Sequence, residues 1–405
     1  MRVQTGLASF LSDAPGAWKS QRVGLVTHAA AVAPDLGSNV DALIQAGVTV
    51  TALFSPEHGL HGATADGAVV HDSTDAQTGL PVYSLYGRTK APSTGVLAQL
   101  DTLIFDMQDV GVRFYTYIST LYCVLKSAAQ VGLQVTVLDR PNPINGMTLE
   151  GPRLEPGYES FVGIAPIPLR YGLTIGELAR YMNAELRLGA ELTVVPMENW
   201  RRDHWYGDTG LAWVPTSPAM PHLTTTVLYP GMCLLEGTNL SEGRGTALPF
   251  EICGAPWIDG AALASHLNAL SLPGVRFRPV QFVPAPGSRF GGELCGGVQV
   301  HVLDHTRCRP LTVGLHLIAC VKALYPADFA WQAPGREGDH PHFDLLVGTD
   351  EVRVVLDAGS AATLTADIQA LIGSWAESHA AFAGVSQPYL LYPRQSDTER
   401  DRRHT

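Results

Sequence analysis

A glutamate and two histidines directly follow an apolar run early in the chain. Residues 48–53 read VTVTAL, which is typical of a buried β-strand, and residues 54–62 follow as FSPEHGLHG. In open α/β sheets, ligands bind at the carboxyl ends of the strands. A glutamate on a loop shaped by proline and glycine at such a position is suited to proton transfer. We therefore predict that Glu57 is the centre of an active site.

A second polar cluster lies at residues 235–246, which read LEGTNLSEGRGT. A solvated turn is one explanation, but glycines are costly unless the backbone needs a positive φ or approaches a ligand closely. The pattern favours a loop that contacts a ligand. In that loop Glu236 or Glu242 is a candidate second carboxylate, and Arg244 is a candidate clamp for an anionic group.

Strand-like and helix-like patterns alternate through the first half of the chain. Apolar runs at residues 23–27, 102–106 and 134–138 predict further buried strands, and residues 39–46 and 116–130 have helical spacing. This alternation predicts a parallel sheet with helices on both of its faces. The polar residues that follow the predicted strands are His28, Glu57, His58, Asp109, Arg113, Asp139, Arg140 and Asn142. Their one-sided placement is expected of a site at the carboxyl edge of a sheet.

One acidic residue has a structural explanation instead. Thr174 and Glu177 have the spacing of a capping box, in which the two side chains satisfy the first backbone groups of a helix. We therefore interpret Glu177 as a helix-start residue.

Sequence signatures of bound cofactors are missing. The first predicted strand is not followed by GxGxxG, and GxxxxGK[ST] does not occur, so nucleotide binding is not predicted. The six cysteines form no CxxC pair and no zinc-finger spacing, which favours buried reduced thiols. We expect neither a metal nor another cofactor.

The composition indicates a large globular protein. The chain has 405 residues, 46% of them hydrophobic and 16% charged, which is enough for two or three domains with sizeable cores. A net charge of -11 argues against a nucleic-acid partner or an anionic membrane surface. We find no signal peptide and no apolar run of membrane-spanning length, so we expect a cytoplasmic protein. The pattern changes near Ala255, which predicts a Rossmann-like catalytic domain at residues 1–254 and a smaller α/β domain at residues 255–405 that forms the second wall of a cleft.

Several of these motifs occur together in one known family. They are residues 55–59, 109–118, 139–144, 150–152, 173–179, 236–246 and 249–251. In this order they resemble the NamZ-type exo-β-N-acetylmuramidases, a family of bacterial cell-wall glycosidases. The resemblance implies a Rossmann-like domain, a smaller α/β domain and a site in the cleft between them. It also implies release of N-acetylmuramic acid from the non-reducing end of peptidoglycan fragments, without a metal or nucleotide.

The resemblance also implies roles for individual residues. Glu57 carries over as the acid/base. The other motif residues carry over as groups that line the substrate site: His28, His58, Arg113, Tyr115, Asn142, Asn239, Glu242 and Arg244. Tyr171 stands where we expect some relatives to have histidine, so no catalytic role is assigned to it.

The chemistry of glycoside hydrolysis leaves the second carboxylate open. It acts as a nucleophile if the two carboxyls lie ~5 Å apart and as a base for water if they lie ~6.5–9.5 Å apart. Asp109, Glu236 and Glu242 compete for this role. The lactyl carboxylate of muramic acid suits an arginine clamp, Arg113 or Arg244, although internal ion pairs would also explain both arginines. A hydrolase of another acidic amino sugar and a non-catalytic sugar-binding protein remain alternatives.

Overall fold

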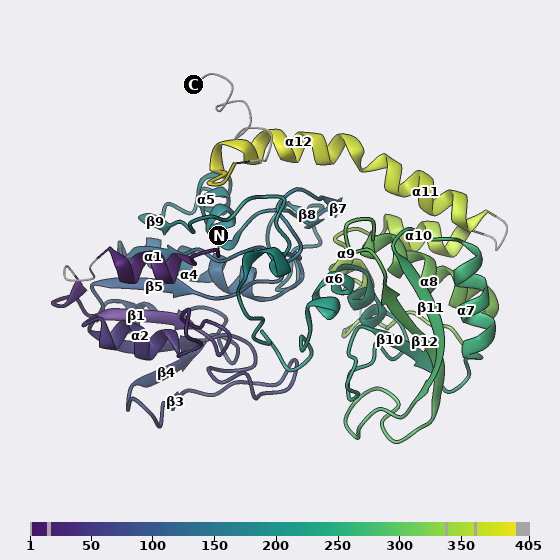
Figure 1. Cartoon of the computed structure of the whole chain (residues 1–405), viewed down its shortest axis with the longest axis horizontal. Coiled ribbons are helices and arrows are strands. Elements are labelled where there is room, and N and C mark those ends of the chain that lie inside the picture. Colours follow the sequence, from purple (N-terminus) through teal and green to yellow (C-terminus); the bar gives the residue numbers. More distant parts are fainter. Residues whose placement is uncertain (1, 14–17, 337–338, 360–362, 394–405) are drawn as a thin grey trace. The chain divides into compact units, whose positions relative to one another are not determined.

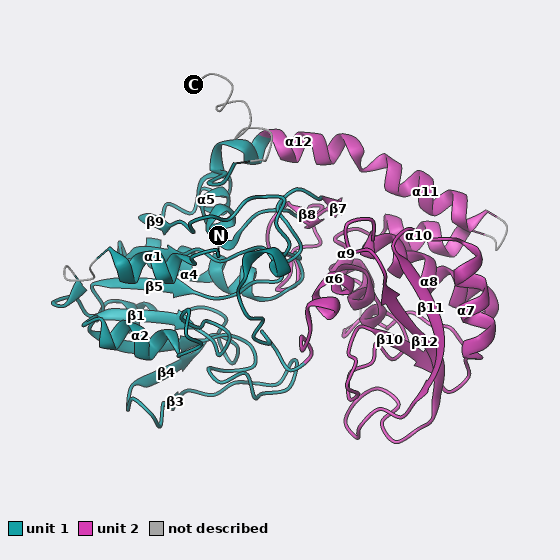
Figure 2. Ribbon diagram, viewed as in Figure 1, with its two compact units in different colours: residues 1–148, 171–218, 385–405 teal, residues 149–170, 219–384 magenta. Residues whose placement is uncertain are grey.

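The chain divides into two compact units, each built from more than one segment. The computed structural model describes residues 2–13, 18–336, 339–359 and 363–393 (Figure 1). Unit 1 contains Met1–Thr148, Tyr171–Pro218 and Val385–Thr405, and unit 2 contains Leu149–Arg170 and Ala219–Gly384 (Figure 2). The expected domain boundary after residue 254 is not tested by this grouping and stays a prediction.

Unit 1 is built on a seven-stranded sheet with the order β3-β4-β2-β1-β5-β6-β9. The strands are β1 (Val23–Thr27), β2 (Val50–Ser55), β3 (Ser73–Thr74), β4 (Pro81–Ser84), β5 (Thr102–Asp106), β6 (Gln134–Leu138) and β9 (Leu192–Val195). Every pairing is parallel except that of β3 with β4. The six parallel strands, numbered along the chain, have the order 3-2-1-4-5-6 of the Rossmann fold. The predicted Rossmann-like sheet is therefore confirmed.

The order of the strands along the sheet reverses at β1, which pairs with β2 on one side and with β5 on the other. This position is the topological switch point of the sheet. Parallel crossovers are right-handed, so helices on opposite sides of this switch point cover opposite faces. Helix α2 (Asn39–Gln45) joins β1 to β2, whereas α4 (Tyr117–Val131) joins β5 to β6 and α5 (Ile175–Glu185) precedes β9. The remaining helical elements of unit 1 are α1 (Gly6–Ser12), α3 (Thr94–Leu97), η2 (Tyr206–Thr209) and η4 (Gln387–Tyr389).

The core of this unit explains why its central strands are continuous apolar runs. All five residues of β1 and all five of β5 are buried, as expected of strands covered on both faces. Leu25 of β1 and Ile104 of β5 pack in one cluster with Leu7 of α1 and Leu43 of α2.

Helix α5 begins as the sequence predicts. Thr174 accepts a hydrogen bond from the backbone of Glu177, and the side chain of Glu177 accepts one from the backbone of Thr174. Glu177 also forms a 2.6 Å ion pair with Arg202. The interpretation of Glu177 as a helix-start residue is confirmed.

Unit 2 contains a three-stranded antiparallel sheet of order β10-β12-β11 and a two-stranded sheet. Its strands are β7 (Glu150–Arg153), β8 (Pro168–Arg170), β10 (Ile252–Ala255), β11 (Val275–Phe282) and β12 (Cys295–Val302). Its described helical elements are α6 (Leu223–Met232), η3 (Cys233–Gly237), α7 (Gly260–Ala269), α8 (Pro310–Leu324), α9 (His342–Val347), α10 (Glu351–Ala358), α11 (Leu364–Ser374) and most of α12 (Ala376–Ser386), whose last two residues belong to unit 1. This confirms the smaller α/β part of the predicted fold. In the described ranges, no helix has the length and apolar character required to cross a membrane.

Helices α6 and α8 approach closely because each has a glycine at the contact. A Cβ on Gly231 would lie 1.8 Å from the backbone oxygen of Pro310, and a Cβ on Gly314 would lie 2.3 Å from that of Gly231. The loop at residues 235–246 follows α6 through η3, so this contact fixes where the loop begins.

Candidate active site

His28 ties together the two strands that flank the switch point. It follows β1, and its Nε2 accepts a 2.9 Å hydrogen bond from the backbone N–H of Gln108, which follows β5. Because a backbone N–H only donates, Nε2 carries no proton in this arrangement and the imidazole is neutral. Burial, together with the nearby charge of Arg140, lowers the pKa of His28 to about 3. His28 therefore holds the site together and is not charged at neutral pH.

Glu57 is held by hydrogen bonds to both of its carboxyl oxygens. Its side chain is buried at the end of β2, with 8% of the residue exposed. Oε1 accepts a 2.8 Å hydrogen bond from the backbone of Gly67, and Oε2 accepts one of 2.8 Å from the hydroxyl of Thr116. The phenol of Tyr86 makes a further hydrogen bond with this carboxyl. The carboxyl is thus fixed in direction.

His58 shapes the loop that reaches back to Glu57. Its backbone is left-handed with φ 71°. One ring nitrogen lies 2.9 Å from the carbonyl of Thr64, and the other lies 3.7 Å from Asp66. These contacts fold residues 58–67 so that the N–H of Gly67 meets Glu57. The predicted substrate contact of His58 is not tested.

Asp109 is a buried carboxylate with two unequal oxygens. Its Oδ2 accepts hydrogen bonds from the backbone of Gly111, at 2.7 Å, and from the hydroxyl of Tyr171. Its Oδ1 is buried and has no hydrogen-bond partner within the described residues. Burial raises the pKa of Asp109 to about 6, although the bonds from Tyr171 and Gly111 act in the opposite direction.

Two tyrosines of the predicted site region bind a segment around Thr216, which the sequence patterns did not indicate. The hydroxyls of Tyr115 and Tyr117 donate to the side chain and the carbonyl of Thr216, each at 2.7 Å. Burial raises the pKa of Tyr117, and the charges of Glu57 and Asp109 raise it further. The charges of both acids therefore act on one phenol. Thr216 belongs to a Pro-Thr-Ser-Pro stretch that lacks any periodic signal.

Arg113 and Asn142, also predicted to line the site, lie in the same unit. Arg113 is fully buried, and burial lowers its pKa to about 9. The amide of Asn142 donates to the carbonyl of Leu173 at 2.8 Å and accepts from the backbone of Ile144 at 3.1 Å. Asn142 thus braces the loop after β6, and its predicted contact with substrate stays a prediction.

The predicted residues of the 235–246 loop form a separate cluster in unit 2. The guanidinium of Arg244 lies 2.7 Å from Glu236 and 3.0 Å from Glu242. Burial opposes ionisation of Glu236, but Arg244 and His342 outweigh it and lower its pKa to about 2. Asn239 is used by the fold, because its side chain bonds the backbone of residues 328 and 330 at 2.7 and 3.0 Å.

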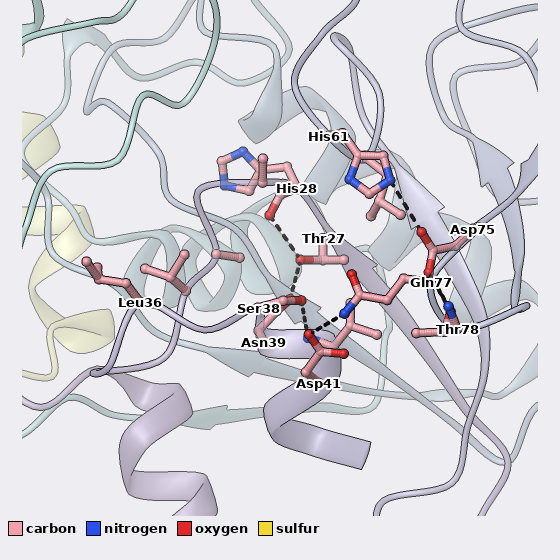
Figure 3. A pocket seen from close by; sticks show the side chains of 15 residues that line it. Thr27, His28, Leu36, Ser38, Asn39, Asp41, His61, Asp75, Gln77 and Thr78 are labelled. Atoms are coloured by element: carbon pink, nitrogen blue, oxygen red, sulfur yellow. Dashed lines mark hydrogen bonds and ion pairs between the residues drawn. The ribbon is translucent and has the colours of Figure 1, made fainter. Parts of the chain in front are cut away.

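A polar cavity of about 240 Å³ lies at the carboxyl end of β1 in unit 1 (Figure 3). Its wall includes Thr27 and His28 after β1, the start of α2, and His61, which lies 3.3 Å from Asp75. Figure 3 shows the side chain of Thr27 directed to Asn39. Neither Glu57 nor Asp109 lines this cavity. In the part of the chain that the structure describes, no group of three or more metal-ligating side chains is arranged to hold an ion.

Fold and site together define a doubly wound α/β protein with buried carboxylates at the switch point of its sheet. Comparison with known proteins places it more narrowly. A model of the N-terminal domain of the exo-beta-N-acetylmuramidase NamZ matches residues 23–224, and a model of its C-terminal domain matches residues 227–392. The chain therefore belongs to the NamZ family, and the resemblance found in its motifs is confirmed.

Individual relatives match almost the whole chain. The peptidoglycan beta-N-acetylmuramidase NamZ of Bacillus subtilis (strain 168) is 44% identical over 392 residues, which cover 96% of this chain and 92% of that protein. Crystal structures of two DUF1343 family proteins from Bacteroides fragilis NCTC 9343 are also similar. The first has a TM-score of 0.86 and 37% sequence identity, and the match covers 97% of this chain and 99% of that one. The second has a TM-score of 0.76 and 29% sequence identity, and the match covers 98% of this chain and 100% of that one.

Proposed function

We propose that this protein is an exo-acting glycoside hydrolase that releases N-acetylmuramic acid from the non-reducing end of peptidoglycan fragments. Its membership of the NamZ family, with both domain models matched in order, carries this conclusion. The Bacillus subtilis relative is named for the same linkage and is similar over nearly the full length of both chains.

Within this function we assign the acid/base role to Glu57. A proton donor in glycoside hydrolysis must face the leaving oxygen in a fixed orientation. The hydrogen bonds from Gly67 and Thr116 supply that orientation at the carboxyl end of β2. His28 is neutral and its Nε2 accepts from Gln108, so we do not assign the proton donor to His28.

The second carboxylate is Asp109 or Glu236 in this proposal, with Glu242 as a further candidate. The charges of Asp109 and Glu57 act on the same phenol, that of Tyr117. Glu236 and Glu242 share the guanidinium of Arg244, and its charge favours the ionised form of Glu236.

Recognition of muramic acid requires a partner for its lactyl carboxylate, and Arg113 and Arg244 are the candidates. Arg244 already contacts two carboxylates, so an anion that binds there must compete with Glu236 and Glu242. Arg113 is on the loop that carries Asp109 and is fully buried. The tyrosines and amides of the predicted site, including Tyr115, Asn142 and Asn239, are proposed to complete the wall around the sugar.

A direct test is the release of N-acetylmuramic acid from its chromogenic β-glycoside by the purified wild-type protein. Parallel reactions with chromogenic glycosides of other acidic amino sugars test the alternative hydrolase. Turnover of the muramic-acid glycoside supports the proposal, and turnover of another sugar alone contradicts it. A protein that binds the glycoside but never cleaves it would be a sugar-binding protein instead. Cytoplasmic location and the lack of a nucleic-acid partner stay predictions.

A further inference from the structure

We infer that Asp109 is the second catalytic carboxylate, acting through Oδ1 as the base that activates water, and that Tyr171 is the residue that positions it. This inference rests on the glycoside hydrolase activity proposed above. It chooses among the candidate carboxylates and adds Tyr171, to which the sequence motifs gave no role.

The first observation is the unequal use of the two oxygens of Asp109. Oδ2 receives two donors, the backbone N–H of Gly111 and the hydroxyl of Tyr171. Oδ1 is buried and makes no hydrogen bond of ordinary geometry within the described part of the chain, although the backbone N–H of Val110 also interacts with this carboxyl. Buried polar atoms in folded proteins are nearly always hydrogen-bonded, and each exception needs an explanation, such as a catalytic role or a bound water. In the inferred reaction, the attacking water is the donor to Oδ1.

The second observation is that Asp109 is held in place from two directions. Gly111 has φ 81°, and a Cβ there would lie 2.4 Å from the side chain of Asn142, so the turn after Asp109 accepts only glycine without rearrangement. Tyr171 is fully buried and lies 62 residues along the chain from Asp109. The carboxylate cannot rotate to offer Oδ2 in place of Oδ1 without breaking both of these bonds.

The third observation separates Asp109 from Glu236. A general base works best when its pKa lies near the working pH. The pKa of Asp109 is raised to about 6, whereas that of Glu236 is lowered to about 2 beside Arg244 and His342. Asp109 is therefore the stronger base of the two.

In the resulting reaction, Glu57 gives its proton to the glycosidic oxygen as the bond between that oxygen and C1 of the sugar breaks. A water oxygen bonds to C1, and the proton of that water passes to Oδ1 of Asp109. One water is consumed, and both products leave with a hydroxyl group. Solvent then returns a proton to Glu57 and removes one from Asp109. Attack by water on the opposite face of the ring inverts the configuration at C1.

The test uses Tyr171→Phe, with Tyr392→Phe as the matched control. Tyr392 is also buried and gives its hydroxyl to another buried carboxylate, that of Asp139. Among the described residues, the titratable groups that interact with Asp109 are the phenols of Tyr115, Tyr117 and Tyr171. The measurement is kcat/KM against pH on the chromogenic muramic-acid glycoside, together with kcat, KM and the thermal midpoint of each variant.

Wild type should lose activity below about pH 6 as Asp109 gains a proton. The bond from Tyr171 lowers the pKa of Asp109, so its loss should move this acid limb upward, by about one pH unit at most, and reduce kcat more than it changes KM. Tyr392→Phe should lower the thermal midpoint but leave the acid limb in place. An acid limb that does not move in Tyr171→Phe, or one near pH 2 in wild type, would overturn the assignment.

Two further results keep the inference separate from the proposed activity. Asp109→Asn, folded by circular dichroism, should lose at least about 100-fold in kcat, as expected when a general base is removed. Proton NMR should show the α-anomer as the first product from the β-glycoside, and a β-anomer would contradict the role as base. A wild-type protein without any activity on this glycoside would contradict the proposed function itself, whatever the variants do.

Discussion

The hydroxyl of Thr116 donates to the carboxylate of Glu57, and its oxygen accepts no hydrogen bond from the helix that it begins. It is the N-cap residue of α4, yet its side chain makes no capping hydrogen bond and lies 2.8 Å from Oε2 of Glu57. A threonine at this position normally satisfies a backbone N–H of the first turn. Thr116 departs from this usual capping role and donates to a proposed catalytic side chain instead. Such departures from local preferences are common at functional sites.

Thr116→Val should therefore impair catalysis more than stability. A hydrogen bond to a charged group contributes about 1.5–3 kcal/mol, which corresponds to a loss of roughly 10- to 150-fold in kcat. The thermal midpoint should change little, because the hydroxyl does not cap α4. Steady-state kinetics and thermal unfolding of the variant measure the two effects.

Thr116→Ser is the matched control, since it keeps the hydroxyl and removes only a methyl group. It should retain most of the wild-type kcat. Equal losses in Thr116→Val and Thr116→Ser would show that the methyl group matters and the hydrogen bond does not.

We predict that the ion pair between Asp106 and Arg140 contributes strongly to the stability of unit 1. Arg140 lies 2.5 Å from Asp106, both side chains are buried, and Asn39 donates to the same carboxylate at 2.8 Å. Asp106→Asn leaves a buried guanidinium without its counter-ion, which should lower the free energy of unfolding by about 3–5 kcal/mol. Urea titration followed by circular dichroism measures this change.

The exposed ion pair between Arg22 and Asp101 provides the comparison within the same unit. Its side chains are 53% and 39% exposed, so Asp101→Asn should barely shift the urea midpoint. If both substitutions shift the midpoint equally, burial is not what gives the Asp106 pair its importance.

Replacement of Arg244 tests the clamp for the lactyl carboxylate. Arg244→Ala should lower kcat/KM for muramic-acid glycosides more than for the matching glucosaminides, which lack that carboxylate. The measurement is the ratio of kcat/KM for the two substrates, compared with the ratio in Arg278→Ala. Arg278 is an exposed residue of unit 2 that bonds Gln299. An equal loss on both substrates would limit Arg244 to its ion pairs with Glu236 and Glu242.

The sequence predicted the sheet and the acids at its edge because these signals are local. The strands β1, β5 and β6 are apolar runs, and His28, Glu57 and Asp109 follow strand ends in the chain. Their position alone, however, did not separate a catalytic carboxylate from a structural imidazole. The contact from Gln108 settles this for His28, because a backbone N–H determines which ring nitrogen is free of a proton.

The partners of the acids were not predictable in the same way. Thr116 is 59 residues from Glu57, and Tyr171 is 62 residues from Asp109. Thr216 is 101 residues from Tyr115. Such pairings arise when the chain folds back across the switch point, and no periodicity or spacing in the sequence records them. Tyr171 in particular had no role until its hydroxyl was found against Asp109.

The assignment of Glu57 as acid/base is tested most directly by Glu57→Gln. The substitution keeps the size of the side chain and removes the acidic proton. A folded variant should release N-acetylmuramic acid from its chromogenic β-glycoside at least about 100-fold more slowly than wild type, while its affinity for the glycoside changes little. Release at a rate near that of wild type would contradict the account.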